Sequence, residues 1–233
     1  MDHEAFFTSL DGAGVDYLVT GGLALNLHGL PRMSTDIDLV LEPGGENIHR
    51  AVRHLRGLGY RPVQALKPEE MSHPEVRRRW IGGGERAVRF VHAEEDLTEV
   101  DLSLEAHLPY AELKERAARV SLGEEEIAVM STADLKSLKK VMGRPRDMED
   151  LEGLKILEEM SREGAGGHTD DPRREQMAKF GHWSMEARCQ WLLTTSQLQQ
   201  QHSPDTARGR GSFRGKRGIK RKKIIGLNKP DLS

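Results

Sequence analysis

The chain has 233 residues, of which 36% are hydrophobic and only 5% aromatic, so we expect part of it to stay outside a packed core. A single cysteine, Cys189, excludes an internal disulfide, and no apolar run reaches the roughly 20 residues of a membrane span. Together with an N-terminus that lacks signal-peptide features, this predicts a cytoplasmic protein with no membrane partner. The net charge of −2 hides an uneven distribution. The first 200 residues are acidic, with 25 basic and 35 acidic side chains, whereas residues 201–233 are basic, with ten basic and two acidic side chains.

Hydrophobic periodicity predicts alternating helices and strands over the first 64 residues. An amphipathic helix is expected at 3–11, a strand at 15–20 and a short helix at 21–29. The second apolar run, to Leu41, predicts a strand that begins at Asp36. After a Pro-Gly-Gly turn, an amphipathic helix at 46–58 and a strand at 60–64 follow.

The next hundred residues begin with a charged stretch, 66–84, in which only 75–80 suggests a helix. Two strands are then predicted at 86–92 and 98–104, a helix at 110–116, and a hairpin of 118–122 with 127–130. Ser131 and Asp134 resemble a capping box that starts a helix ending at Met142. Pro145 suits the first turn of another helix, whose apolar stripe reaches Met160.

Composition divides the chain into four parts. Residues 1–163 predict one domain, 164–172 a Gly-rich linker, 173–200 a helical extension, and 201–233 a basic disordered tail. The tail's lysines and arginines suit RNA phosphates, but its only aromatic residue is Phe213. We therefore interpret it as a solubilising or accidental extension.

The segment from 17 to 41 carries the strongest chemical signal. A strand ends in Gly21-Gly22, a short helix follows, and Asp36-Ile-Asp38 opens the next strand. Residues two apart on a strand share a face, so Asp36 and Asp38 stand side by side. Two adjacent carboxylates repel unless a cation lies between them, and a hard ion such as Mg²⁺ prefers oxygen ligands.

Gly21-Gly22 followed by Asp36-x-Asp38 resembles the signature of the nucleotidyltransferase (DNA polymerase β-like) superfamily. The wider context is similar to the small bacterial AbiEii-type toxins and minimal nucleotidyltransferases, over about residues 1–160. The resemblance implies an α/β fold with a small mixed twisted sheet flanked by helices. It also implies transfer of a nucleoside monophosphate from a nucleoside triphosphate (NTP) to a hydroxyl, with two Mg²⁺ ions.

By the same resemblance, Asp36 and Asp38 bind both metal ions, and Asp101 is the third catalytic carboxylate. Strand alternation supports Asp101, because Val100 and Leu102 take the opposite face. Gly21 and Gly22 would let the backbone approach the triphosphate. Many resembling proteins have serine at the second position, so one side-chain contact is missing here.

Four further residues are expected to bind the nucleotide. Arg32 and Thr35 precede the acidic pair, where a basic residue of the resembling toxins faces the phosphates. Lys139 and Arg144 align with the basic positions of a downstream motif that ends in Gly-Arg-Pro-Lys-Asp, from which this chain departs by having Arg146 in place of the lysine. Lys139 is expected to reach the triphosphate, and Arg144 either does so or pairs with Asp147.

The resemblance leaves the acceptor open between RNA, such as a tRNA 3′ end, and a protein side chain, and it implies a cognate antitoxin. Two alternatives remain: a non-catalytic nucleic-acid or partner-binding module on the same fold, and a small-molecule nucleotidyltransferase of the aminoglycoside type. The first is disfavoured because all three acidic residues are present. The second is disfavoured because no separate substrate-binding domain is evident.

Overall fold

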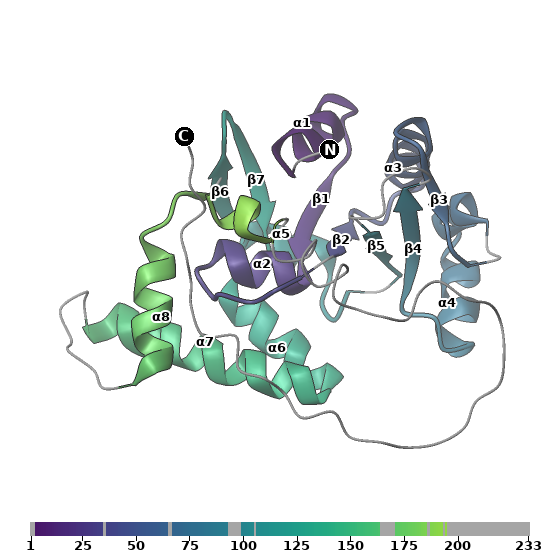
Figure 1. Cartoon of the computed structure of the whole chain (residues 1–233). Coiled ribbons are helices and arrows are strands. Elements are labelled where there is room, and N and C mark those ends of the chain that lie inside the picture. Colours follow the sequence, from purple (N-terminus) through teal and green to yellow (C-terminus); the bar gives the residue numbers. More distant parts are fainter. Residues whose placement is uncertain are drawn as a thin grey trace, which may run out of the picture.

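A computed structural model describes residues 3–34, 36–64, 67–92, 99–104, 106–163, 171–185, 187–192 and 194. Figure 1 shows the arrangement of its helices and strands. Thr35, most of the expected linker and the expected basic tail lie outside the described residues.

One mixed sheet of seven strands, in the order β3-β4-β5-β2-β1-β7-β6, forms the centre of the molecule (Figure 1). Its strands are β1 (Tyr17–Thr20), β2 (Asp36–Leu41), β3 (Tyr60–Pro62), β4 (Ala87–His92), β5 (Glu99–Ser103), β6 (Ala118–Leu122) and β7 (Glu125–Val129). The β2–β5 and β1–β7 pairs are parallel, and the other four pairs are antiparallel. This architecture confirms the expected α/β fold with a mixed sheet.

Helices lie on both sides of the sheet in Figure 1, with α1 and α3 above it and α6 and α7 below. The helices are α1 (His3–Gly12), α2 (Gly21–Leu27), α3 (Gly45–Gly57), α4 (Pro74–Gly82), α5 (Tyr110–Glu115), α6 (Thr132–Met142), α7 (Pro145–Glu163) and α8 (Pro172–Gly181), with a 3₁₀ helix η1 (Pro68–Ser72). Alternation along β2 buries Ile37 and Leu39 in the core and turns Asp36 and Asp38 to the other face.

Local signals account for the ends of α6. The Ser131 hydroxyl accepts a hydrogen bond from the Asp134 amide at 3.1 Å, which satisfies one free donor of the first turn. At the other end Gly143 adopts a left-handed conformation with φ 61°, which glycine reaches without steric cost. The helix therefore begins and ends where the sequence predicts.

Two segments differ from the expectation. Pro68 starts the 3₁₀ helix η1 in the stretch that the sequence left unassigned, and α4 is longer than the predicted helix. The predicted extension at 173–200 is also divided, because α8 ends at Gly181 and the described residues from 185 to 194 are helical again. Phe180 packs against both Trp183 and Trp191, with ring centroids 5.3 Å apart, so aromatic contacts connect the two helical parts.

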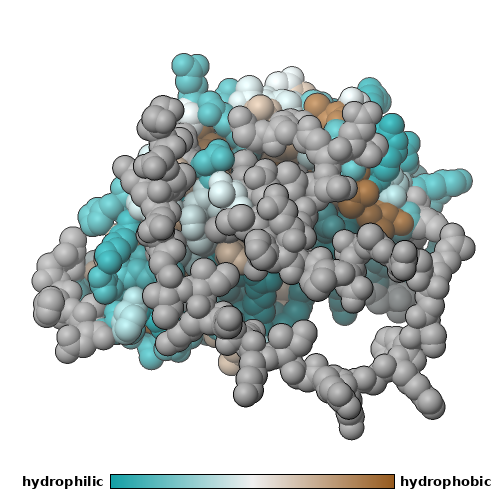
Figure 2. Space-filling view, viewed as in Figure 1, coloured by the Kyte–Doolittle hydropathy of each residue, from teal (hydrophilic) through white to brown (hydrophobic). Residues whose placement is uncertain are grey.

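On the face seen in Figure 2, the visible described residues are mostly hydrophilic, and hydrophobic residues occupy small areas. Within the described part of the chain, no helix combines the length and apolar character that crossing a membrane would require.

Candidate active site

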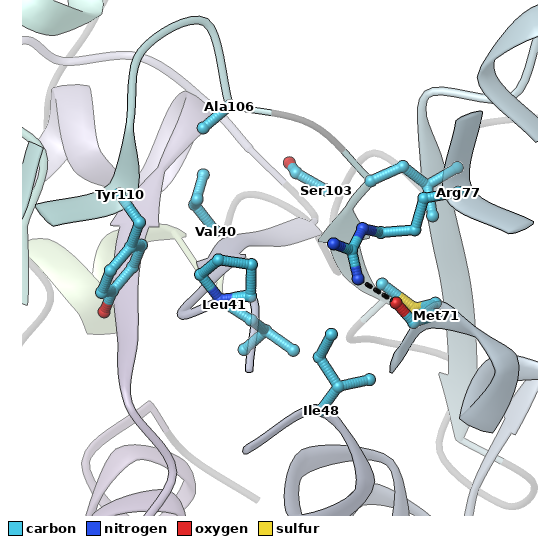
Figure 3. A pocket seen from close by; sticks show the side chains of 10 residues that line it. Val40, Leu41, Ile48, Met71, Arg77, Ser103, Ala106 and Tyr110 are labelled. Carbon is cyan, nitrogen blue, oxygen red and sulfur yellow. Dashed lines mark hydrogen bonds between the residues drawn. The ribbon is translucent and has the colours of Figure 1, made fainter. Parts of the chain in front are cut away.

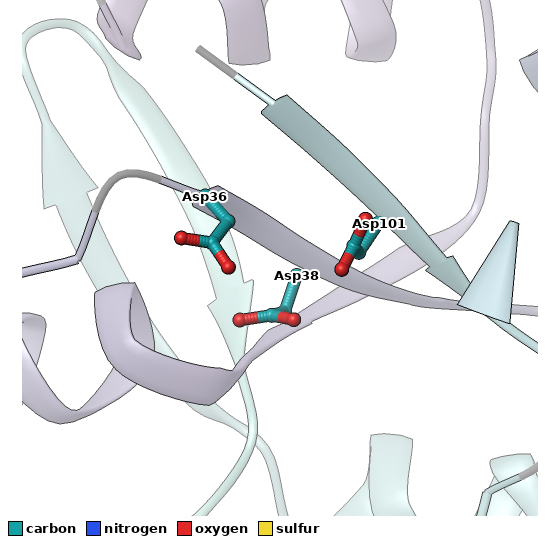
Figure 4. A group of neighbouring side chains, drawn as sticks. All are labelled: Asp36, Asp38 and Asp101. Carbon is teal, nitrogen blue, oxygen red and sulfur yellow. The ribbon is translucent and has the colours of Figure 1, made fainter. Parts of the chain in front are cut away.

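Asp36, Asp38 and Asp101 form one cluster on the sheet (Figure 4). β2 and β5 run parallel, with Asp38 directly opposite Asp101 and Asp36 opposite Glu99. One carboxylate oxygen from each of the three aspartates lies within 4.8 Å of the others. The structure thus brings Asp101 to the acidic pair across 63 residues of sequence.

The electrostatics of this cluster favour a cation. Burial, followed by the neighbouring charges of Asp36 and Asp101, raises the pKa of the Asp38 carboxyl to about 6. The backbone amide of Gly22 and the charge of Arg32 act in the opposite direction. Three converging carboxylates fit a hard divalent ion such as Mg²⁺, which would relieve their mutual repulsion.

Gly21 and Gly22 bring the β1–α2 turn against this cluster. Gly21 has φ 63°, and a Cβ atom there would lie 2.8 Å from the Cβ of Asp38. At Gly22 a Cβ atom would lie 2.6 Å from the Cβ of Ser34 and would also overlap the guanidinium of Arg32. The serine of many resembling proteins therefore does not fit here without movement of the Arg32–Ser34 loop.

Arg32 and Lys139 meet in a buried ion-pair network with two carboxylates of α7. Asp150 accepts from Arg32 Nε at 2.9 Å, and its other oxygen lies 2.6 Å from Lys139 Nζ. Lys139 also donates to Asp147 at 3.1 Å, and its side chain is only 7% exposed. Arg32 also acts on Asp38 through its charge, whereas the Lys139 ammonium is enclosed by two carboxylates of α7.

Arg144 follows the second of the two roles considered for it. Its backbone amide donates to Asp147 at 3.0 Å, and its guanidinium Nε lies 3.8 Å from the same carboxylate. The side chain is 61% exposed. Its neighbour Arg146 donates to the carbonyl of Met33 at 2.6 Å, and so holds the α6–α7 turn to the loop before Asp36.

The sequence interpretation did not single out Arg89, which lies directly opposite Asp101 on β4. Its Nε and Nη2 atoms donate to the two oxygens of Asp101 at 2.9 and 2.8 Å. The signal was present in the alternation of β4, because buried Val88 and Phe90 leave Arg89 on the polar face.

A separate pocket lies at the other end of β2 and β5, between Arg77 and Tyr110 (Figure 3). Val40, Leu41 and Ile48 supply apolar walls, and Arg77 donates a hydrogen bond to the carbonyl of Met71. None of the residues predicted for catalysis or nucleotide binding lines it.

Comparison with known proteins adds a family match. Residues 6–151 match the family described as nucleotidyl transferase AbiEii toxin, type IV toxin–antitoxin system. No curated protein matches the chain.

Three similar solved structures are antibiotic-modifying enzymes or resistance factors. The lincomycin-bound lincosamide antibiotic adenylyltransferase LnuA shares 13% identity over 66% of this chain and 94% of its own, with a TM-score of 0.46. The ANT(2″)-Ia complex with adenylyl-2″-tobramycin shares 15% identity over 75% of this chain and 92% of its own, with a TM-score of 0.43. A solution structure of the antibiotic-resistance factor ANT(2″)-Ia shares 13% identity over 84% of this chain and 92% of its own, with a TM-score of 0.43.

Proposed function

This chain belongs to the AbiEii nucleotidyltransferase toxin family, and we propose that it transfers a nucleoside monophosphate from an NTP to a hydroxyl of RNA or protein in a metal-dependent reaction. The observation that carries this proposal is the convergence of Asp36, Asp38 and Asp101 within 4.8 Å beside a Gly-Gly turn. Such a cluster is costly for the protein unless a bound cation uses it.

Asp36, Asp38 and Asp101 would hold Mg²⁺, because hard divalent cations prefer carboxylate oxygens. Bound Mg²⁺ stabilises negative charge on the attacking and leaving oxygens of a phosphoryl displacement. Asp101 comes from β5, the strand next to β2, and we assign it the second role of accepting the proton of the acceptor hydroxyl.

Gly21 and Gly22 would let the backbone of the β1–α2 turn approach the triphosphate beside the acidic cluster, because neither residue carries a side chain. Arg32 is the best-placed cation, because it acts on Asp38 and is oriented by Asp150. Thr35, Lys139 and Arg144 remain assigned to the nucleotide site. Lys139 would contribute from its buried position by fixing Asp150, and Arg144 by shaping the turn before α7.

The acceptor is proposed to be RNA, including a tRNA 3′ end, or a protein side chain. Transfer to a cellular macromolecule would make the protein toxic, as the family description implies, and a cognate antitoxin would oppose it. Small-molecule transfer, as in aminoglycoside nucleotidyltransferases, is the second candidate. It predicts label on an added aminoglycoside instead of on a macromolecule.

Incubation with each α-labelled NTP and Mg²⁺, together with total RNA, cell lysate or an aminoglycoside, tests this proposal. We expect label on RNA or protein, and near-complete loss of transfer in Asp36→Asn, Asp38→Asn and Asp101→Asn. The losses should not add, because the three carboxylates work as a unit. Glu126→Gln, at an exposed position of β7, is the matched control. Full transfer by the Asp36 and Asp38 variants, or no divalent-dependent labelling by the wild type, would overturn the proposal.

A further inference from the structure

Arg89 closes a row of side chains that crosses the sheet on the catalytic face. The register places Asp38 opposite Asp101 on one side, and Asp101 opposite Arg89 on the other. Arg89 engages both oxygens of Asp101 in a two-pronged contact. A planar guanidinium matches a carboxylate in this geometry, and a lysine does not reproduce it.

The same guanidinium also holds a fourth carboxylate. Glu99 is two residues before Asp101 on β5, so both side chains share a face, and Asp36 lies opposite Glu99. Arg89 Nη1 lies 2.9 Å from Glu99 Oε2. Since Nε and Nη2 contact Asp101, all three guanidinium nitrogens contact acids at the edge of the cluster.

We propose that Arg89 is a positioning residue and an internal countercation of the acidic cluster, which orients Asp101 and withholds Glu99 from the metal site. Four acidic side chains share this part of the sheet, and oxygen ligands alone do not decide which of them a cation selects. Arg89 makes that choice by engaging Glu99, while each Asp101 oxygen keeps a second lone pair for another partner.

This inference rests on the proposed metal-dependent function, and it has consequences that do not require transfer. Removal of Arg89 takes one positive charge from beside the cluster and frees Glu99. Both effects increase the attraction for a divalent ion, although Asp101 loses its orientation. A merely structural role of Arg89 would lower stability without tightening metal binding, and a substrate contact would raise the KM for the acceptor alone.

The test measures Mn²⁺ binding without NTP, thermal unfolding in EDTA, and transfer kinetics for the wild type, Arg89→Met and Arg89→Lys. For Arg89→Met we expect a Mn²⁺ Kd about threefold to tenfold lower. We also expect a lower metal-free melting temperature, and a kcat about tenfold or more lower, as is typical when a residue that orients a metal ligand is lost. Arg89→Lys should recover the wild-type Kd but not the full kcat, because lysine restores the positive charge without the two-pronged contact to Asp101.

Arg86→Met is the matched control, because Arg86 is exposed just before β4 and has no ion pair among the described residues. It should leave the Mn²⁺ Kd unchanged. An unchanged or weaker Mn²⁺ affinity in Arg89→Met, or a defect confined to the KM for the acceptor, would overturn the role assigned to Arg89. Absence of Mn²⁺ binding by the wild type, or binding that survives Asp38→Asn, would instead refute the metal site itself.

Discussion

At the scale of single residues, the site depends on which side chains face each other across neighbouring strands. Thr20, Asp38, Asp101 and Arg89 occupy successive positions of one row on β1, β2, β5 and β4. Alternation along one strand predicts that Asp36 and Asp38 share a face, because it requires only local geometry. The approach of Arg89 to Asp101 depends on strand order and register, which local periodicity does not contain.

Gly21 is the residue whose replacement tests the close approach of the turn to the acidic cluster. Gly21→Ala places a side chain at φ 63° and drives its Cβ atom toward Asp38. We expect a loss of about 1–3 kcal/mol in unfolding free energy, because a non-glycine residue is strained there. Mn²⁺ binding and transfer should weaken as Asp38 moves, which titration and the labelling assay would measure.

Gly57→Ala provides the control for Gly21→Ala. Gly57 is the last residue of α3, and a Cβ atom there would meet nothing within 4 Å. This change should leave metal binding and transfer intact. Equal behaviour of the two variants would show that Gly21 does not need to be glycine.

At the scale of elements, the α6–α7 pair shows what sequence patterns leave out. The capping residues Ser131 and Gly143 are local, and they placed the ends of α6 correctly. The expectation that Lys139 reaches a triphosphate came from its alignment with a family motif, which does not show what packs against it. Packing of α7 against α6 instead surrounds its ammonium with Asp147 and Asp150, a consequence of tertiary structure.

Lys139→Met therefore has a predicted effect on folding as well as on nucleotide binding. It leaves Asp147 and Asp150 buried without their shared cation, and loss of one partner from a buried ion pair costs about 3–5 kcal/mol. Chemical denaturation should show a loss of that size. Lys140→Met, at the exposed neighbouring position, should change stability little. Equal stability of the two variants, with only the KM for NTP raised in Lys139→Met, would show instead that Lys139 contacts the triphosphate.

His28 makes stability depend on pH at the end of α2. Its Nε2 atom donates to the carbonyl of Met130 at 2.8 Å, and burial lowers the pKa of the imidazole below its usual 6.5. The unfolded chain then binds more protons than the folded protein near pH 6, so stability is lost as pH falls from 7.5 toward 5.5. His28→Gln can keep the donor and cannot be protonated, so its melting temperature should fall less over this range. Parallel pH curves for the two proteins would contradict the prediction.

At the scale of the whole molecule, the fold class and most elements follow from the sequence because amphipathic periods and turn residues are local signals. The order of the strands in the sheet depends on contacts between distant parts of the sequence. β2 pairs with β5, although β3 and β4 lie between them in the sequence, and β1 pairs with β7. The family resemblance predicted a mixed sheet and a strand carrying Asp101 next to the acidic pair, but it gave no strand order. Neither local periodicity nor the family resemblance predicted how the C-terminal helices pack, because they lie beyond the matched residues 6–151.

Those C-terminal helices contact α2, the helix that follows the Gly21-Gly22 turn, directly. Arg188 is buried and donates to the carbonyl of Leu27, the last residue of α2, at 3.0 Å. It also donates to the carbonyls of Phe180 and Gly181 at the end of α8. Its guanidinium thus joins backbone groups of two helix ends. The extension is consequently part of the core that supports α2.

Two truncations test this division of the C-terminal region. A chain that ends at Gly167 loses the buried side chains Phe180 and Leu192 together with Arg188, each apolar one worth about 1.5–3 kcal/mol. We expect its melting temperature to fall by about 5 °C or more.

A chain that ends at Gln201 should keep the wild-type melting temperature, because the basic residues beyond it contain too little apolar surface to offset about 1–2 kcal/mol of ordering entropy per residue. Differential scanning calorimetry of both proteins decides the matter. A large loss in the Gln201 chain would mean that the tail packs, whereas an unchanged Gly167 chain would mean that the fold needs nothing beyond α7.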